Sequence, residues 1–110
     1  MSRTAPASVR RAAALGLTLH KEFKRGGTKV GWARARQLSQ GRTVSDAVIR
    51  RMVSFFARHE VDKRAANFGN RANPSNGYIA WLLWGGDSGY TWAKKEKAKL
   101  DKAKQTTTRK

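Results

Sequence analysis

The segment from residue 41 to residue 63, GRTVSDAVIRRMVSFFARHEVDK, combines closely spaced arginines with a run of apolar side chains. At the 100° interval of an α-helix these residues separate into two arcs. The apolar arc holds Val48, Ile49, Met52, Val53, Phe55 and Phe56. The opposite arc holds Arg50, Arg51, Ser54 and Arg58, with no acidic residue between them. Guanidinium groups bind phosphate and carboxylate through paired hydrogen bonds, so the basic arc has the chemistry of an anion-binding surface.

Positive charge dominates the whole sequence. The 110 residues include 24 Lys and Arg against 7 Asp and Glu, which gives a net charge of +17. Residues 1–72 hold sixteen of these bases and residues 94–110 hold eight, whereas residues 73–93 hold none. A field of one sign attracts polyanions, and a basic excess of this size is typical of nucleic-acid-binding proteins. We therefore expect a nucleic acid as the partner.

The residues that enzymes use most often are scarce. The chain contains no cysteine, which excludes a disulfide scaffold, a thiolate metal site and a cysteine nucleophile. His20 and His59 are its only histidines, and its seven acids are scattered. A metal site needs several ligands at close spacing, so we predict no metal, no cofactor and no enzymatic activity. His59 falls on the apolar arc, where we expect a buried, hydrogen-bonded structural histidine.

The apolar runs are too short for a membrane span. The longest extends from residue 78 to residue 84 between glycines, whereas a span needs about 18 residues. The first residues, MSRTAPASVRR, lack the continuous apolar segment of a secretory leader. We therefore expect a soluble protein of the bacterial or host-cell cytoplasm.

Hydrophobic periodicity predicts the helices that would position the basic arc. Helices are expected at residues 8–24, at 29–40 with Thr28 as N-cap, from Thr43 or Ser45 to Arg58 or His59, and at 78–84. A last helix is expected after a cap at Asp87 or Ser88. No strand alternation of useful length is present. The predicted fold is therefore all-α, a compact bundle of about five short helices with a basic C-terminal helical tail. Its expected core consists of Phe23, Leu38, Met52, Phe55, Phe56, Trp81 and Trp84.

Composition divides the chain into three parts. We predict a flexible N-terminus over residues 1–7 and a helical DNA-binding domain over residues 8–94. Residues 95–110 are rich in lysine but offer only Leu100 for burial, so this segment is expected to fray. We interpret it as a basic linker or tail.

The second and third predicted helices have the size of a helix-turn-helix unit, in which the second helix of the pair lies in the major groove of DNA. Under this interpretation Arg50, Arg51, Ser54 and Arg58 face the DNA. The alternative is that they form the solvated face of an amphipathic helix. The first helix carries a similar basic arc of Arg10, Arg11, Lys21 and Arg25. Two arcs of one sign repel unless a partner compensates them, which favours the DNA interpretation.

The start of the second helix is a second candidate contact. The backbone amides of Gly27, Thr28 and Lys29 open this helix next to Lys24 and Arg25, and a helix N-terminus of this kind can bind a DNA phosphate. The alternative is that the glycines only mark the boundary between two helices. The same segment can serve both as a cap and as a phosphate contact.

The four tryptophans suggest base stacking, as in proteins that bind single strands. Trp81 and Trp84 lie in the uncharged segment, so core packing explains them better. Trp32 stands beside Arg34 and Arg36 and is kept as a possible nucleic-acid contact. No aromatic ribonucleoprotein motif is visible, but a basic helical surface can bind either duplex, so RNA remains open.

Two blocks of the sequence carry a resemblance to a known family. GGTKVGWARARQLSQGRTVSDAVIRRMVSFFARHEVDK and PSNGYIAWLLWGGDSGYTWA resemble a small domain of bacteriophage-derived proteins. The similarity covers about residues 8–94 and is closest to the N-terminal DNA-binding domain of phage-type ATP-dependent DNA ligases. It implies a module that holds duplex DNA, nicked or intact, for a catalytic domain linked at its C-terminus. The chain itself has no K-x-D-G nucleotidyltransferase motif.

The sequence thus predicts a monomeric, non-sequence-specific module for double-stranded DNA. The alternative is a phage virion structural or assembly subunit that contacts packaged DNA. The candidate DNA-binding residues are Arg10, Lys21, Lys24, Arg25, Gly27, Thr28, Lys29, Trp32, Arg34, Arg36, Arg42, Arg50, Arg51, Ser54 and Arg58.

Overall fold

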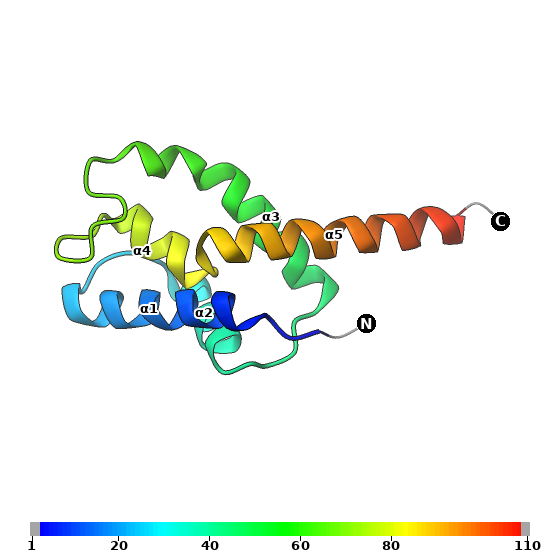
Figure 1. Ribbon diagram of the computed structural model, residues 1–110, viewed down its shortest axis with the longest axis horizontal. Helices are drawn as coiled ribbons and strands as arrows, with labels where there is room; N and C mark the ends of the chain where they lie inside the picture. Colours follow the sequence, from blue (N-terminus) through cyan, green and yellow to red (C-terminus); the bar gives the residue numbers. More distant parts are fainter. Residues whose placement is uncertain (1–2, 109–110) are drawn as a thin grey trace.

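The computed structural model describes residues 3–108, with side chains up to residue 103. Its helices are α1 (Ala7–Phe23), α2 (Lys29–Ser39), α3 (Asp46–His59), the 3₁₀ turn η1 (Glu60–Arg64), α4 (Asn76–Leu83) and α5 (Gly86–Thr108) (Figure 1). Over the described residues the chain forms no strand beyond one isolated bridge. The prediction of an all-α bundle of about five helices is confirmed.

Local capping signals set where three of the helices begin. The hydroxyls of Thr28, Ser45 and Ser75 each accept a hydrogen bond from a backbone N–H three residues later, at 3.2, 3.3 and 3.0 Å. These caps satisfy amides that the first helical turn leaves unpaired. The prediction that Thr28 caps the second helix is confirmed.

Helix α4 lies at the centre of the bundle and packs against every other helix. Gly16 brings α1 close to it, because a Cβ at that position would lie 2.7 Å from the backbone nitrogen of Leu83. Phe56 is fully buried and packs on Trp81 of α4 and Tyr90 of α5, with ring centroids 4.7 and 4.9 Å away. Leu38, Met52, Phe55, Phe56, Trp81 and Trp84 of the predicted core are buried, and Phe23 is only partly buried.

The N-terminal segment is packed from residue 3 onward, so the expected flexibility of residues 1–7 is wrong for its described part. The backbone of Arg3 accepts a hydrogen bond from the N–H of Val44 at 2.7 Å. The Arg3 guanidinium pairs with Asp46 at 2.7 Å and with Glu96 at 3.0 Å, and Ala5 is buried. Residues 1 and 2 lie outside the described residues.

The basic C-terminal segment continues one helix. Helix α5 runs without interruption through the predicted boundary between residues 94 and 95, and Figure 1 shows it extending beyond the other helices. Glu96 pairs with Arg3, Asp101 pairs with Arg50 at 3.1 Å, and Leu100 packs against the core. These contacts explain why fraying from residue 95, as expected from the sequence, is wrong up to residue 101. Residues 109 and 110 of the segment expected to fray lie outside the described residues.

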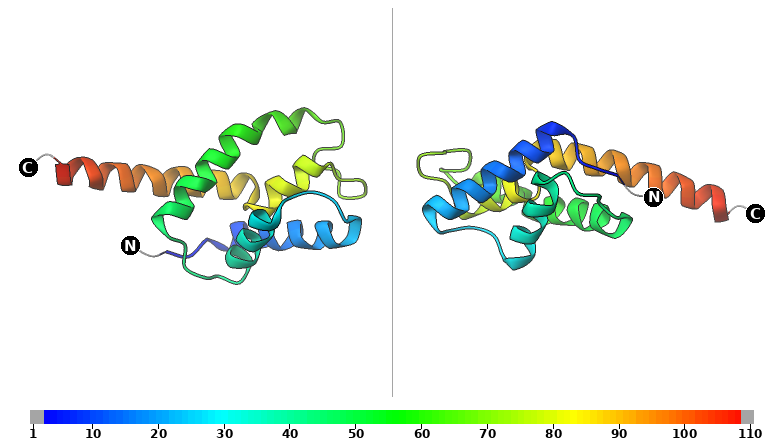
Figure 2. Two further views of the ribbon diagram at one scale, coloured as in Figure 1. Left: turned by 180° about the vertical axis from the view of Figure 1, so that it is seen from behind. Right: turned by 90° about the horizontal axis from the view of Figure 1, so that it is seen from below.

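The predicted helix-turn-helix packing is absent from this part of the fold. No Cα atom of α2 lies within 8 Å of a Cα atom of α3, although both helices are fully described. Helix α2 packs on α1 and α4, and α3 crosses α5 (Figure 2). The apolar residues of the two helices face different partners, so the two helices separate and leave a groove between them.

Candidate nucleic-acid interface

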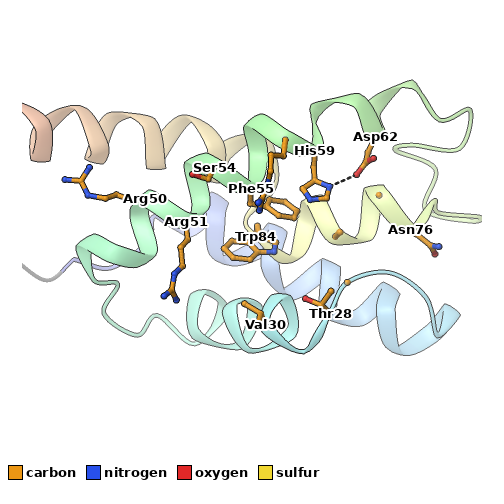
Figure 3. Close-up of a pocket in the computed structure, with 14 residues that line it drawn as sticks. Thr28, Val30, Arg50, Arg51, Ser54, Phe55, His59, Asp62, Asn76 and Trp84 are labelled. Carbon is orange, nitrogen blue, oxygen red and sulfur yellow. Dashed lines mark hydrogen bonds and ion pairs between the residues drawn. The ribbon is translucent and has the colours of Figure 1, made fainter.

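A pocket of about 750 Å³ occupies the space between α2 and α3 (Figure 3). Helix α3 forms one wall, and the start of α2 forms the opposite wall. Helix α4 and Trp84 form the floor, and η1 closes one end. The lining residues are Gly27, Thr28, Val30, Arg50, Arg51, Ser54, Phe55, Arg58, His59, Asp62, Asn76, Gly77, Ala80 and Trp84. We refer to this space as the α2–α3 groove.

The floor of the groove contains a column of stacked flat groups. The ring of Phe55 lies 4.4 Å from that of His59 and 4.7 Å from that of Trp84, at interplanar angles of 26° and 13°. The guanidinium of Arg34 lies over the Trp84 ring, 5.3 Å from its centroid. Phe55 and Trp84 are 7% and 8% exposed, so the column also belongs to the core. The groove therefore has a rigid aromatic floor.

The arginines of α3 differ in how their charges are compensated. Arg51 and Arg58 are exposed and form no ion pair with any side chain that the structure describes. Arg50 donates to the Asp101 carboxylate of α5 at 3.1 Å. The basic arc is free of acids within α3, but the fold adds one at Arg50. Arg51 and Arg58 are thus the cations that this face leaves available.

Arg34 of α2 is held in place by its own neighbours. Its guanidinium donates to the side-chain oxygen of Gln37 at 2.6 Å, and Gln37 in turn donates to the backbone oxygen of Thr43 at 2.8 Å. Burial, and then the nearby charge of Arg51, lower the pKa of Arg34 from its ordinary value. The charges of Arg34 and Arg51, on facing helices, repel each other, and an anion placed near both would relieve this repulsion.

The wall opposite α3 is the beginning of α2. Thr28 caps this helix, and no acidic side chain occupies its first turn. Gly27 has a φ of +82°, and a Cβ there would lie 2.5 Å from a methyl group of Leu83 and 2.7 Å from the Trp32 indole nitrogen. Only glycine fits this close approach. Lys29 follows the cap and is exposed.

His59 lies at the open end of the aromatic column. Its side chain is 41% exposed, stacks on Phe55 and bonds through Nδ1 to the Asp62 carboxylate at 3.1 Å. The expectation of a hydrogen-bonded histidine is confirmed, but the expectation of burial is wrong. The α2–α3 separation explains the difference, because no helix covers the outer side of the ring.

Two predicted contacts have internal roles in the fold. The indole N–H of Trp32 donates to the backbone oxygen of Gly26 at 3.2 Å, and its ring stacks on His20 at 4.4 Å. Arg25 donates to the side chain of Asn73 at 3.2 Å and to the backbone oxygen of Pro74 at 3.0 Å. Trp32 thus bonds to the loop before α2, and Arg25 bonds to the loop before α4.

The structure gathers part of the predicted set in the groove and leaves the rest outside it. Gly27, Thr28, Arg50, Arg51, Ser54 and Arg58 line the groove. Arg10, Lys21, Lys24, Lys29, Arg36 and Arg42 are exposed on surfaces outside it. Whether any of these residues contacts DNA stays a prediction.

The aromatic and neutral lining of the groove was not anticipated from the sequence. The sequence predicts Phe55 and Trp84 as core residues only, and its patterns do not single out Val30, Asn76 and Ala80. A signal was present in the spacing of Arg51, Phe55 and Arg58, because residues three and four apart lie on one side of a helix. Val30, which also lines the groove, is 56% exposed and adds an apolar side chain to this surface.

Other kinds of site are not found in the described part of the chain. Residues 3–108 contain no group of three or more potential metal ligands. Among the same residues, no helix combines the length and apolar character needed to cross a bilayer.

Comparisons with protein-family models, with curated proteins and with solved structures found no match for this chain. The resemblance to the DNA-binding domain of phage-type ligases therefore stays a prediction from the sequence.

Proposed function

We propose that this chain is a double-stranded DNA-binding module without sequence specificity, and that it binds through the face that carries the α2–α3 groove. The observation that carries the proposal is the position of Arg51 and Arg58, two exposed cations on one rim with no acidic partner in the described residues. Lys29 lies at the start of the helix that forms the opposite wall.

Electrostatics favour a polyanionic partner over a small anion. The net charge of +17 supplies attraction over the whole surface, and each bound phosphate releases counterions from the duplex. Arginine binds phosphates of any sequence, so strong preference for one sequence is not expected. We further propose that the module acts in the cytoplasm, has no catalytic activity of its own, and can be joined through α5 to a catalytic domain.

Salt-dependent binding to a short duplex tests the proposal. With about six to eight phosphates neutralised, fluorescence anisotropy should give a slope of log affinity against log salt of about −5 to −7. Scrambled duplexes of equal length should bind equally, and a nicked duplex is included to test the implication of the ligase resemblance. Absence of duplex binding at low salt contradicts the proposal.

A further inference from the structure

The α2–α3 groove has a composition that a contact with continuous duplex does not require. A duplex, whose major groove alone is about 12 Å wide, is too wide to enter a pocket of about 750 Å³ and can only lie across its mouth. Pockets of roughly 300–1,000 Å³ are the size that encloses a small organic group. A group that enters the interior must therefore be smaller than a duplex.

We propose that the α2–α3 groove receives one unpaired nucleobase, so that the module prefers DNA containing an unpaired nucleotide. This inference rests on the proposed DNA-binding function and adds the chemical class of the group that the groove binds. It is argued from the floor, the neutral lining and the rim in turn.

The floor offers a stack that a base can extend. Phe55 and Trp84 are nearly parallel, and His59 is the last ring of the column, with its side chain 41% exposed. Figure 3 shows His59, Phe55 and Trp84 side by side in the groove. A base that stacks on the open end of this column replaces solvent on an aromatic surface. Such stacking accepts every base, which agrees with a module of low sequence specificity.

The neutral lining offers hydrogen bonds to the edge of a base. Asn76, Ser54 and Thr28 line the groove and carry an amide with donor and acceptor atoms and two hydroxyls, of which that of Thr28 already accepts from the Gly31 N–H at 3.2 Å. Amide side chains pair with base edges that carry a donor next to an acceptor. These residues come from three different parts of the chain and line the same pocket as Phe55 and Trp84.

The rim offers cations for the phosphates on either side of the base. Arg51 and Arg58 stand two helical turns apart on α3, and both line the groove. An acidic peptide would also satisfy these arginines, but it has no flat group to extend the column unless it carries an aromatic residue. The joint presence of a stacking floor, an amide and two arginines fits a nucleotide better.

The test compares DNAs that differ only in one base. One duplex carries a single extra 2-aminopurine nucleotide as a bulge, the second carries an abasic bulge at the same position, and the third is continuous. The abasic bulge keeps the phosphate and the distortion but removes the base. We expect the 2-aminopurine bulge to bind about fivefold to a hundredfold more tightly than the abasic bulge, the range given by one base stacked on an aromatic ring. Its fluorescence should fall on binding.

A variant that fills the groove tests the location. Ala80 lines the floor, so Ala80→Leu should remove the preference for the base while leaving binding to continuous duplex within about twofold. Ala57→Leu is the matched control, because Ala57 is exposed on α3 and does not line the groove. Ser54→Leu, on the exposed rim, gives a second obstruction if Ala80→Leu lowers the melting temperature.

The outcomes separate this inference from the proposed function. Equal binding of the base and abasic bulges, with duplex binding intact, overturns the inference and leaves the proposed function standing. Loss of binding to all three DNAs overturns both. A preference that survives Ala80→Leu and Ser54→Leu also overturns the inference, because the base then binds elsewhere. Competition by an acidic peptide with one tryptophan, at lower concentration than the bulged DNA, would assign the groove to a peptide.

Discussion

The two sides of α3 carry the same residue type in opposite electrostatic settings. At the edge of the groove next to α5, Arg50 pairs with Asp101 at 3.1 Å, and Arg3 pairs with Glu96 of α5 at 3.0 Å. On the side that faces the groove, Arg51 and Arg58 have no acidic partner among the described side chains. The acids of α5 neutralise cations where helices meet, and the cations left over mark the surface that can bind an anion.

The adjacent phenylalanines of α3 show the same division. Phe56 is fully buried between Trp81 and Tyr90, on the side of α4 and α5. Phe55 lies one position earlier and lines the groove, stacked between His59 and Trp84. Two consecutive residues of one helix thus face the packed interior and the groove.

The largest expected effect comes from the packing side. Phe56→Ala should lower the free energy of unfolding by about 3–5 kcal/mol, because it removes the ring that joins α4 to α5 and leaves a cavity. Urea denaturation followed by circular dichroism measures this loss. Phe55→Ala should cost less, since its site opens into the groove and solvent can fill it. A larger loss for Phe55→Ala would contradict the assignment of the two sides.

The second largest effect is expected for DNA affinity, when the unpaired arginines that line the groove are replaced. Replacing both Arg51 and Arg58 by Ala should weaken duplex binding by about tenfold per arginine near 0.1 M salt and make the salt slope less steep by about 1.8. Stability should remain nearly unchanged, because neither side chain is buried or ion-paired in the described structure. Anisotropy at several salt concentrations measures both quantities. An unchanged slope with native stability moves the DNA-binding face elsewhere.

The elements of the fold were largely predictable because their signals are local. The Thr28 cap, the glycines that follow α1 and the apolar arc of α3 each act within a few residues. The same reasoning placed Arg51 and Arg58 on the arc of α3 opposite the apolar one, and both are exposed in the structure. It located the start of each of the five helices within about three residues.

The contacts that decide the site were not predictable, because they join residues far apart in sequence. Arg50 and Asp101 are 51 positions apart, and nothing in either segment indicates that they meet. Arg3 likewise reaches Glu96 on α5. The separation of α2 from α3 follows from what each helix packs against, which periodicity within one helix does not specify. The packing of residues 3–7, the packing of α5 up to residue 101 and the lack of contact between α2 and α3 therefore differ from the sequence expectation.

A smaller effect sharpens the comparison at Arg50. Because Asp101 already compensates this cation, Arg50→Ala should make the salt slope less steep by clearly less than the value of about 0.9 expected for Arg51→Ala. Asp101→Asn should do the reverse, strengthening duplex binding and steepening the slope, because it frees Arg50. Lys97 also bonds to Asp101, so the same variant releases a second cation. Equal slopes for Arg50→Ala and Arg51→Ala would show that DNA displaces Asp101.

The smallest effect is a pH dependence confined to the packing side. The hydrogen bond from Lys63, and then that from the Trp81 indole, keep the pKa of Asp87 below its usual range. A carboxyl with a lowered pKa in the folded state stabilises the fold above the ordinary aspartate value of about 3.9, and this contribution disappears as the pH falls below it. The free energy of unfolding, measured by denaturation, should therefore fall between about pH 5 and pH 3. Asp87→Asn should reduce this fall by about 0–1 kcal/mol, because the ion pair is largely exposed.

Asp87→Asn retains an acceptor for the indole of Trp81, so at neutral pH the stability of this variant should fall only by the contribution of the lost ion pair. Because Asp87 does not line the groove, DNA affinity at neutral pH should stay as in the original chain. If Asp87→Asn changes DNA binding as much as Arg51→Ala does, the two sides of α3 are coupled and the division between packing and binding fails.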